Sequence, residues 1–477
     1  MSLKKIELTN DSDYKSEIDK VHEELEILQQ EIQISTVSNP EELEKLEQDI
    51  RQLTDRLGSL LLGQKVQASL DSEEGQVAEQ ELVKSIPAKF KSEGKKEVHI
   101  DTSFGYQITV WVRYYRRPCD RRKRSHKSGF YPGLVLLGIY ERCTPHFSSE
   151  VSVLAAMLGS FEEAQQVLAA RGVEIGIKSI RRITYRSAER ARMVQQMEEI
   201  EMDLGDPNTK RRIVICADGG RIRLREKKRG PKTKKRRNRY KGAWREPKLF
   251  IIYVVDEEGK KMKTCAPLID GTLSGPNVLF SLLLSYLRQL NIQPEDILLF
   301  VSDGAKWIWL RVPMLVVGLG LKPGQLFELI DFFHATQHLH AVSKLRKDWK
   351  PSQRKRWLTI QRKRLLKGQV ELVITSIRSL CRGRNSKAIR THLNYFVTHR
   401  HRMAYDKVAE MKLPIGSGAI ESAIRRVVNL RLKGPSIFWC KGHAEELLML
   451  RSYYKSGRWK LFKKMANSPL AAIASLA

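Results

Sequence analysis

Hydrophobic positions near the N-terminus recur at alternating spacings of three and four residues. This pattern runs from Ile18 to Ile32 and again from Leu43 to Leu57, and it is typical of the a/d seam of a coiled coil. Between the two runs, Asn39 is placed to cap a helix whose first residue is Pro40. Residues 1–64 are therefore predicted to form two helices, either folded back as a hairpin or paired between subunits.

The next two regions have different patterns. Residues 65–95 are polar and weakly patterned, which predicts a linker with one short helix. Residues 96–146 contain two stretches of alternating polar and apolar side chains, which predict strands joined near Gly105. We therefore expect a small β-rich region after the linker.

Residues 147–205 return to helical periodicity in three segments. Ser160 and Glu163 form a capping box at the start of the middle segment, and Gly172 is placed to end it. Three helices joined by short turns are typical of a helix-turn-helix domain, although such helices also pack together in proteins that bind no DNA. The DNA-contacting positions would lie on the third helix, at Lys178, Arg181 and Arg182.

From residue 206 onward, apolar strands alternate with helices. Strands are predicted at 211–225, 248–260, 262–270, 296–305 and 325–335, and a helix at 277–290. Three closely spaced strands, a crossover helix and two further strands describe a mixed α/β sheet. We assign residues 206–342 to the first part of this core and 343–410 to a basic helical insertion. The core would resume over 411–460 and end in a tail, 461–477.

The charge of the chain suggests its partner. There are 85 Lys and Arg against 54 Asp and Glu, a net charge of +31. Residues 1–50 are acidic, with 14 acids and 5 bases, which leaves 80 bases and 40 acids in the rest of the chain. Such an excess favours a polyanion, most simply nucleic acid, although a ribosome-like RNA binder or a need for solubility would also explain it.

No apolar run approaches the roughly 18 residues that cross a bilayer, and the N-terminus lacks the layout of a signal peptide. We therefore expect a cytoplasmic protein associated with DNA. The six cysteines are scattered and are expected to be reduced. A degenerate zinc ribbon is one reading of Cys119, His126, Cys143 and His146, but the close Cys-x2-Cys pairs of such sites are missing, which argues against structural zinc.

The most basic segment lies between the first two predicted strands of the core. Residues 226–248 carry 12 Lys or Arg and only two acids. We expect a flexible loop that contacts the phosphate backbone, with aromatic side chains able to stack on bases. Its predicted DNA-binding residues are Lys234, Lys235, Arg236, Arg237, Arg239, Tyr240 and Trp244.

Aspartates follow three of the predicted strands. Asp218, Asp303 and Asp331 each come directly after an apolar run. Strands often end at Asp-Gly turns, so each aspartate alone also has a purely structural explanation. Carboxylates that converge on one sheet edge repel one another unless a cation or a proton holds them together. Clustered carboxylates with two Mg²⁺ ions are the usual means of phosphodiester cleavage or transfer.

A fourth acid, Glu421, stands behind a Gly-Ser-Gly break among basic residues. If Ser417 caps the helix, the capping-box position falls on Ile420 and not on Glu421. Capping therefore explains this acid poorly, and a third carboxylate facing Asp218 and Asp303 explains it better. The helix is predicted to end at Gly434 and Pro435, with DNA contacts at Arg425, Arg431 and Lys433.

Two further groups of residues lie near these acids in sequence. His334 and His338 are four apart on one predicted helical face, but the Glu of a zincin motif is absent. We interpret His334 and His338 as supporting the metal ligands or contacting DNA, and Asp331 as supporting the metal ligands. Trp349 and Trp357, in the insertion, could stack on a displaced base, although packing in the core is the commoner role.

Taken in order, several motifs resemble a known family, the bacterial DDE-type insertion-sequence transposases, particularly the ISKra-like group and its Mutator-like relatives. The match covers about residues 100–455 and rests on "ADGG" at 217–220, "SDGA" at 302–305, "DFFHA" at 331–335, "GSGAIES" at 416–422, "RLKG" at 431–434 and "WCKGHAEELLMLR" at 439–451. The chain departs from the family at Phe333, where a tyrosine is common, and near Cys119, where relatives have more cysteines.

The resemblance implies a ribonuclease H-like core in which Asp218, Asp303 and Glu421 are both catalytic and metal-binding, with Asp331 and His334 matching the family's Asp-x2-His signature. It implies two Mg²⁺ (or Mn²⁺) ions, cleavage at the ends of a mobile element, and transfer of the freed strand to target DNA. Bringing two ends together implies at least a homodimer. The alternatives are an inactive, domesticated transposase that only binds DNA, and a metal-dependent nuclease that never joins strands.

Overall fold

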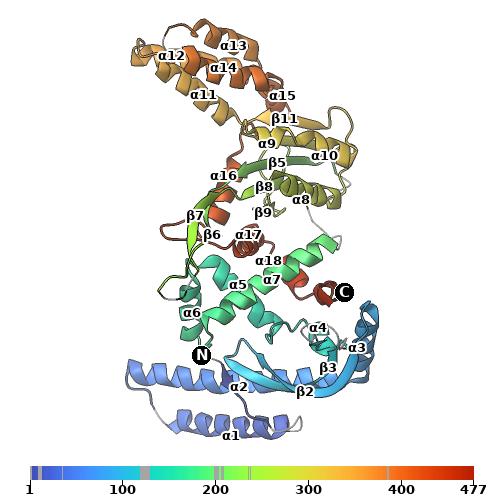
Figure 1. Cartoon of the computed structure of the whole chain (residues 1–477). Coiled ribbons are helices and arrows are strands. Elements are labelled where there is room, and N and C mark those ends of the chain that lie inside the picture. The colour runs from blue at the N-terminus through green and yellow to red at the C-terminus, as the bar shows by residue number, and fades with distance from the viewer. Residues whose placement is uncertain are drawn as a thin grey trace. The chain divides into compact units, whose positions relative to one another are not determined.

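The computed structural model describes residues 3–8, 13–34, 36–118, 129–197, 204–205, 209–234, 236, 238–383 and 386–476. The chain is a mixed α/β protein (Figure 1) and divides into two compact units. Unit 1 comprises Met1–Glu198 together with Trp459–Ala477, and unit 2 comprises Glu199–Arg458. The predicted C-terminal tail therefore belongs to the same compact unit as the N-terminal regions.

Unit 1 begins with a helical hairpin. Helices α1 (Asp13–Ile34) and α2 (Pro40–Asp71) pack on each other, and Asn39 caps α2 by accepting a hydrogen bond from the backbone N–H of Glu42 at 2.9 Å. The heptad positions near Val21 and Leu60 are buried, whereas those near the hairpin tip are exposed. The structure thus has the hairpin, one of the two predicted arrangements.

Residues 65–95 include the predicted short helix, but much of the rest of the segment also forms regular structure. Helix α2 continues to Asp71, α3 (Glu73–Ser85) follows after one residue, and strand β2 begins at Lys91. The segment has few apolar side chains, but it buries Leu70 against the sheet and Leu82 against a second cluster. These few apolar contacts stabilise regular structure in a segment whose composition is mostly polar.

The β-rich region forms as predicted around one hairpin. Strands β2 (Lys91–Asp101) and β3 (Tyr106–Arg116) are antiparallel, and Gly105 has the positive φ of 82° that the turn requires. The short strands β1 (Lys4–Lys5) and β4 (Gly129–Phe130) pair with β3, and helix α4 (Pro132–Leu136) follows. Cys119 and His126 lie outside the described residues, while Cys143 is buried and His146 is exposed.

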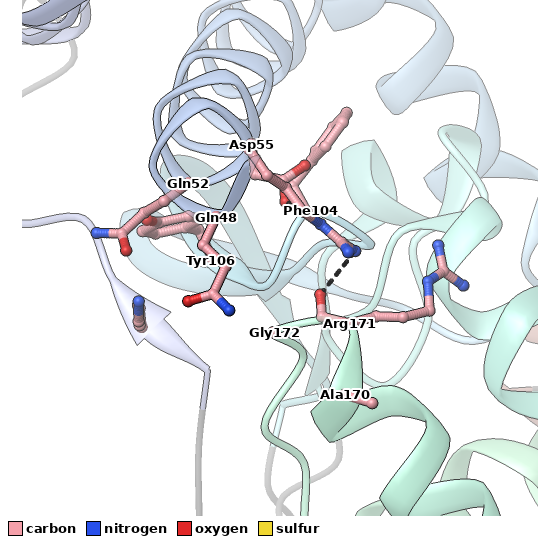
Figure 2. Close-up of a pocket in the computed structure, with 10 residues that line it drawn as sticks. Gln48, Gln52, Asp55, Phe104, Tyr106, Ala170, Arg171 and Gly172 are labelled. Atoms are coloured by element: carbon pink, nitrogen blue, oxygen red, sulfur yellow. Dashed lines mark hydrogen bonds and ion pairs between the residues drawn. The ribbon is translucent and has the colours of Figure 1, made fainter. Parts of the chain in front are cut away.

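A pocket of about 270 Å³ lies where α2, the β2–β3 turn and the end of α6 (Phe161–Ala170) meet (Figure 2). Arg51 of α2 donates a hydrogen bond to the carbonyl of Arg171 at 3.0 Å, the interaction drawn as a dashed line. A Cβ added at Gly105 would lie 2.6 Å from the carbonyl oxygen of Gly172. The β2–β3 turn is therefore closely fitted to the end of α6.

The three predicted helices of 147–205 are present as α5 (Pro145–Met157), α6 and α7 (Ile177–Met197). Ser160 caps α6 by accepting from the backbone N–H of Glu163 at 3.0 Å. Helices α18 (Trp459–Ala466) and α19 (Leu470–Leu476) pack on α7. Trp459 donates to the hydroxyl of Ser149 at 2.9 Å, which helps to hold these C-terminal helices in place.

Unit 2 is built on a five-stranded sheet in the order β11-β10-β5-β8-β9. Strands β5, β8 and β9 follow one another antiparallel, and β10 is parallel to both β5 and β11. Helix α8 (Pro276–Gln289) forms the crossover between β9 and β10. The strands are β5 (Arg212–Gly219), β8 (Lys248–Val255), β9 (Leu268–Thr272), β10 (Ile297–Ser302) and β11 (Leu326–Ile330). The predicted mixed α/β sheet is confirmed.

The predicted strand 211–225 is two strands. The chain leaves the sheet after Gly219 and continues as β6 (Ile222–Lys227), which pairs with β7 (Tyr240–Arg245) in a two-stranded ribbon. Residues 226–248 were predicted to be a flexible loop, but they include part of β6 and all of β7. The apolar run ends at the Asp-Gly turn, and the prediction wrongly carried one strand across the two glycines.

The insertion is helical, as predicted, and Figure 1 shows its helices beyond β11. They are α11 (Phe332–Leu345), α12 (Pro351–Leu366), α13 (Val370–Ser379), α14 (Ser386–His399), the 3-10 turn η1 (Arg400–Arg402) and α15 (Tyr405–Glu410). Trp349 and Trp357 are half-buried against each other, with ring centroids 5.7 Å apart. Before the insertion, two short helices follow β10: α9 (Lys306–Trp309) and α10 (Val312–Leu319).

The helix that carries Glu421 ends earlier than predicted. Helix α16 (Gly418–Ile424) continues as a π-helical turn, η2 (Arg425–Asn429), and the helix does not reach Gly434. A last long helix of unit 2, α17 (Lys441–Lys455), follows.

Within the described ranges, no helix is both long and apolar enough to cross a membrane. The five described cysteines are free thiols.

Candidate active site

The central parallel strands bring two of the predicted catalytic aspartates together. Phe300 of β10 pairs with Ile215 of β5. When the same register is followed for three more residues, Asp303 stands opposite Asp218. Neighbouring strands lie about 4.8 Å apart, so these two aspartates are direct neighbours at the carboxyl ends of their strands. The apolar run before each of these residues predicts this convergence.

Asp331 extends the same row on the next strand. Ser302 of β10 pairs with Ile330 of β11, so the residues that follow, Asp303 and Asp331, are also opposite each other. The backbone N–H of Asp331 donates to the carbonyl of Ser302 at 2.8 Å. We call Asp218, Asp303 and Asp331 the carboxylate row.

The surroundings of Asp218 disfavour its ionised form. The pKa of this carboxyl is raised to about 6, mainly by burial and also by the negative charges of Asp303 and Glu246, although a hydrogen bond from the backbone N–H of Gly219 and the nearby His334 oppose the rise. Asp303 accepts a hydrogen bond from the backbone N–H of Ala305 at 2.9 Å. Two carboxylates that repel each other in a partly buried position are a place where a cation would be stabilised.

Asp331 has a different role in the structure from that of Asp218. Its side chain is only 1% exposed, and one oxygen caps α11 by accepting from the backbone N–H of His334 at 2.8 Å. The other oxygen accepts from both the backbone N–H and the hydroxyl of Ser417, the latter at 2.6 Å. Both oxygens are thus engaged, and Asp331 attaches the segment before α16 to the end of β11.

Glu421 lies in the first turn of α16, which packs on β5 and β8. Ser417 does not cap this helix with its side chain, because its hydroxyl donates to Asp331. Ile424, one turn after Glu421, would be 3.5 Å from a Cβ added at Gly220, two residues beyond Asp218. Helix α16 therefore lies against the end of β5, and the side chain of Glu421 is exposed on it.

The π-helical turn after α16 is held by a residue that sequence analysis did not single out. Arg451 of α17 is buried, and it donates to the carbonyl of Val427 at 2.6 Å and to that of Arg426. A π-turn breaks the usual i to i−4 hydrogen bonding and leaves carbonyls in need of donors. Burial lowers the pKa of this guanidinium to about 10, which still leaves it charged at neutral pH.

The two histidines of the "HATQHLH" motif have different surroundings. His334 is half-buried and lies close enough to Asp218 to lower the pKa of that carboxyl. His338 packs against α14, where its Nδ1 is 3.0 Å from Nδ1 of His392 and its ring stacks on Tyr395. Burial and the neighbouring histidines lower the pKa of His338 to about 4.

Helix α14 contributes residues that sequence reasoning missed. His392, Tyr395 and His399 lie within two turns of it. His392 contacts His338, whereas Tyr395 and His399 lie near Gly304, the residue after Asp303. The only signal in the sequence was their spacing of three and four residues, which places them on one helical face. That spacing does not reveal which other helix the face packs against.

The residues fit a hard divalent cation in their chemistry. Asp218, Asp303 and Glu421 offer carboxylate oxygens, the ligands that Mg²⁺ prefers. Among the residues that the structure describes, no three His, Cys, Asp or Glu side chains are gathered closely enough to hold a metal ion as they stand. Glu421 is exposed at the surface of α16, and holding a cation together with the two aspartates would require its side chain to turn toward them.

A basic and aromatic surface lies next to the acids in sequence, on the β6–β7 ribbon. Trp244 is 53% and Tyr240 45% exposed. They are four residues apart on β7, so their side chains lie on the same face of the strand. Arg223 of β6 lies over the Trp244 ring at 5.5 Å, and Arg225 lies over the Tyr240 ring at 4.9 Å. We call β6, β7 and the residues between them the basic ribbon.

The basic ribbon is held in unit 2 by the segment before α17. Trp439 exchanges backbone hydrogen bonds with β6, donating to Arg223 at 3.0 Å and accepting from Arg225 at 2.8 Å. The Tyr240 ring also meets the Phe438 ring edge to face, at 5.6 Å. The exposed aromatic rings therefore belong to a paired strand and not to a flexible loop.

The other predicted DNA contacts fall into three groups. Most are exposed: Lys178, Arg181 and Arg182 on α7, Lys234, Arg236 and Arg239 on the basic ribbon, Arg425 at the start of η2, and Lys433. Arg431 is only 4% exposed and its guanidinium lies over the Trp439 ring at 5.2 Å, so the expectation that it contacts DNA is withdrawn. Lys235 and Arg237 lie outside the described residues.

Comparisons with models of protein families, with curated proteins and with solved structures found no match for this chain. Any function assigned to the chain therefore rests on its own residues and their arrangement.

Proposed function

We propose that the chain is a DDE-type DNA transposase, which cuts DNA at the ends of a mobile element and transfers the freed strand to target DNA. One observation carries this proposal. Asp218 and Asp303 are neighbours at the carboxyl ends of adjacent parallel strands, and the helix bearing Glu421 packs on the same strand as Asp218. An open α/β sheet usually has its chemistry at this edge.

The strand order supports a ribonuclease H-like core. Three successive antiparallel strands, a crossover helix and two further parallel strands match what the family resemblance implies. The long interval of 118 residues between Asp303 and Glu421 is occupied by helices α9 to α15 and by β11. Because the chain returns to the sheet only at α16, the third acid comes from far along the sequence.

In the proposed mechanism, Asp218, Asp303 and Glu421 hold the cations through their carboxylate oxygens. Bound Mg²⁺ or Mn²⁺ supplies activation of the attacking oxygen and stabilisation of the leaving oxygen. First, a water oxygen attacks the phosphorus at the element end, and the bond from phosphorus to the 3′ oxygen breaks. This step frees a 3′-hydroxyl. That hydroxyl then attacks a target phosphodiester, so one P–O bond forms as another breaks, with no covalent bond to the protein. Asp331 and Ser417 keep α16 beside the sheet while these steps occur.

The basic surfaces would hold the DNA. Lysines and arginines on α7 and on the basic ribbon would contact phosphates, and Trp244 and Tyr240 would stack on exposed bases. Synapsis of two element ends requires at least two subunits, and the exposed heptad positions at the tip of the α1–α2 hairpin are suited to pairing. Association with DNA would follow from the same contacts.

The test of this function is a strand-cleavage and strand-transfer assay with labelled element-end DNA, target DNA and Mg²⁺. The end sequence is to be taken from inverted repeats that flank the gene. Cleavage followed by joining is the expected result. Cleavage without joining would mean a nuclease, and binding without cleavage would mean a DNA-binding protein, so either result would overturn the proposal.

The role of the basic ribbon can be tested separately by DNA affinity. Trp244→Ala is expected to weaken DNA binding roughly 5- to 100-fold, because stacking contributes about 1–3 kcal/mol per base, and to leave its salt dependence unchanged. Lys234→Ala with Arg239→Ala should instead lower the slope of log affinity against log salt by about 0.9 for each phosphate that is no longer neutralised. Fluorescence anisotropy over a range of NaCl concentrations measures both. Unchanged binding in both variants would remove the ribbon from the DNA interface.

A further inference from the structure

Tyr395 of α14 is fixed directly behind the carboxylate row. Its ring stacks on His338, with centroids 3.7 Å apart and planes 12° from parallel. On another side it touches Gly304, where an added Cβ would lie only 2.3 Å from Cε2 of the tyrosine. Gly304 directly follows Asp303, so the insertion helix α14 and the end of β10 are in close contact at this ring.

The hydroxyl of Tyr395 is buried and has no hydrogen-bond partner. Buried tyrosine hydroxyls normally find one, because leaving such a group unpaired is unfavourable. The negative charges of Asp303 and Asp331 both act on this hydroxyl, and together with burial they raise its pKa. The Tyr395 hydroxyl is therefore held near two carboxylates but donates a hydrogen bond to neither.

Of these two carboxylates, Asp303 is the one with capacity to accept. Asp331 already receives three hydrogen bonds, from His334 and from Ser417, through both of its oxygens. Asp303 receives its side-chain hydrogen bond from the backbone N–H of Ala305 on Oδ1. The second oxygen of Asp303, Oδ2, is therefore the remaining acceptor for a donor such as the tyrosine hydroxyl.

We infer that Tyr395 is a positioning residue for the cation site, and that its hydroxyl donates a hydrogen bond to the Asp303 carboxylate when the site is loaded. This inference rests on the proposed function of Asp303 as a metal ligand. It gives the helical insertion a part in the chemistry, because α14 would then orient a ligand that the sheet alone leaves free to rotate. Partners of this kind orient metal-binding carboxylates and strengthen metal binding.

The test is Tyr395→Phe, which keeps the ring, its stacking on His338 and its fit against Gly304. The melting temperature without metal is expected to stay the same or rise, because the variant removes an unpaired hydroxyl from the interior. The Mg²⁺ concentration for half-maximal strand cleavage is expected to rise about 10- to 100-fold, with the rate largely recovered at saturating Mg²⁺. The increase in melting temperature on adding Mn²⁺ should need correspondingly more Mn²⁺.

Tyr405→Phe is the matched control. The Tyr405 hydroxyl is also buried without a partner in the same helical region, but the charges acting on it are those of Tyr395 and Asp331, not that of Asp303. Its loss should leave the metal dependence as in the wild type. An equal change in both variants would overturn the inference, as would a wild-type metal dependence in Tyr395→Phe or a clear fall in its metal-free melting temperature.

The two proposals can fail independently. If the wild type cleaves DNA in Mg²⁺ and Tyr395→Phe needs no more metal than the wild type, the inference fails and the function stands. If the wild type cleaves nothing, the Mn²⁺ thermal shift still reports on the site. A shift that is lost in Asp303→Asn and weakened in Tyr395→Phe would then support the inference although the proposed function had failed.

Discussion

Asp218→Asn, Asp303→Asn and Glu421→Gln are each expected to abolish strand cleavage and strand transfer while leaving binding of end DNA nearly unchanged. Each substitution keeps the size of the side chain and removes one anionic ligand. Metal ions supply several kcal/mol of transition-state stabilisation in such reactions, so the rate should fall by about 10³-fold or more. Cleavage of labelled ends in Mg²⁺ measures the loss, and anisotropy with the same DNA measures binding.

Asp256→Asn is the matched control for these variants. Asp256 also follows a strand of the same sheet, β8, but β8 is antiparallel to β5 and so ends at the opposite edge. Its side chain serves a turn, accepting from the backbone N–H groups of Glu258 and Lys260. This variant should cleave DNA at close to the wild-type rate. Retained cleavage in one of the three acid variants would remove that residue from the proposed triad.

The strand ends that carry Asp218, Asp303 and Asp331 were predictable because each follows a short, mainly apolar run. Such a run marks a strand buried on both faces, and the first polar residue after it marks the edge of the sheet. The register was not predictable. Asp303 stands opposite Asp218 because β10 pairs directly with β5. These strands are 85 residues apart in the sequence, and the local pattern does not indicate which strands pair.

The error at Arg431 has a specific physical cause. Helical periodicity carried from Glu421 to Gly434 places Arg431 among the exposed basic residues, but the helix changes to a π-turn at Arg425 and ends at Asn429. Arg431 lies beyond the end of the helix, so helical periodicity does not set the direction of its side chain, which is buried with its guanidinium over the Trp439 ring. The partner that stabilises the turn, Arg451, lies 20 residues further along and gave no local signal.

Asp331 was predicted to support the metal ligands, and its contacts specify how it would do so. The sequence shows a strand-end aspartate three residues before His334, which is enough to predict a helix cap. It does not show that the second oxygen receives Ser417, because that contact joins positions 86 residues apart. This contact accounts for Ser417, and Gly416 fits against the Phe333 ring, where a Cβ would come within 2.8 Å.

Asp331→Asn is expected to destabilise unit 2 and to reduce cleavage together with stability. An amide has only one acceptor oxygen, so its NH₂ group would face either the N–H of His334 or the two donors of Ser417. Buried donors left unsatisfied cost about 1–3 kcal/mol each, and a loss of about 2–4 kcal/mol should lower the melting temperature by roughly 5–15 °C. Thermal melts followed by circular dichroism, without metal, measure the change.

Asp331→Asn and Asp218→Asn are both expected to lose activity. Their melting temperatures, however, should change in different directions. Because the pKa of Asp218 is raised to about 6, its ionisation disfavours the folded state; this cost is absent below about pH 4 and fully present above about pH 6. Asp218→Asn should therefore melt at or above the wild type at pH 8 without metal, whereas Asp331→Asn should melt well below it. Asp348→Asn, at an exposed residue paired with Arg346, should change stability by less than about 0.5 kcal/mol. Equal destabilisation of the Asp218 and Asp331 variants would mean that both aspartates serve the fold, and the distinction between a ligand and a structural clamp would no longer hold.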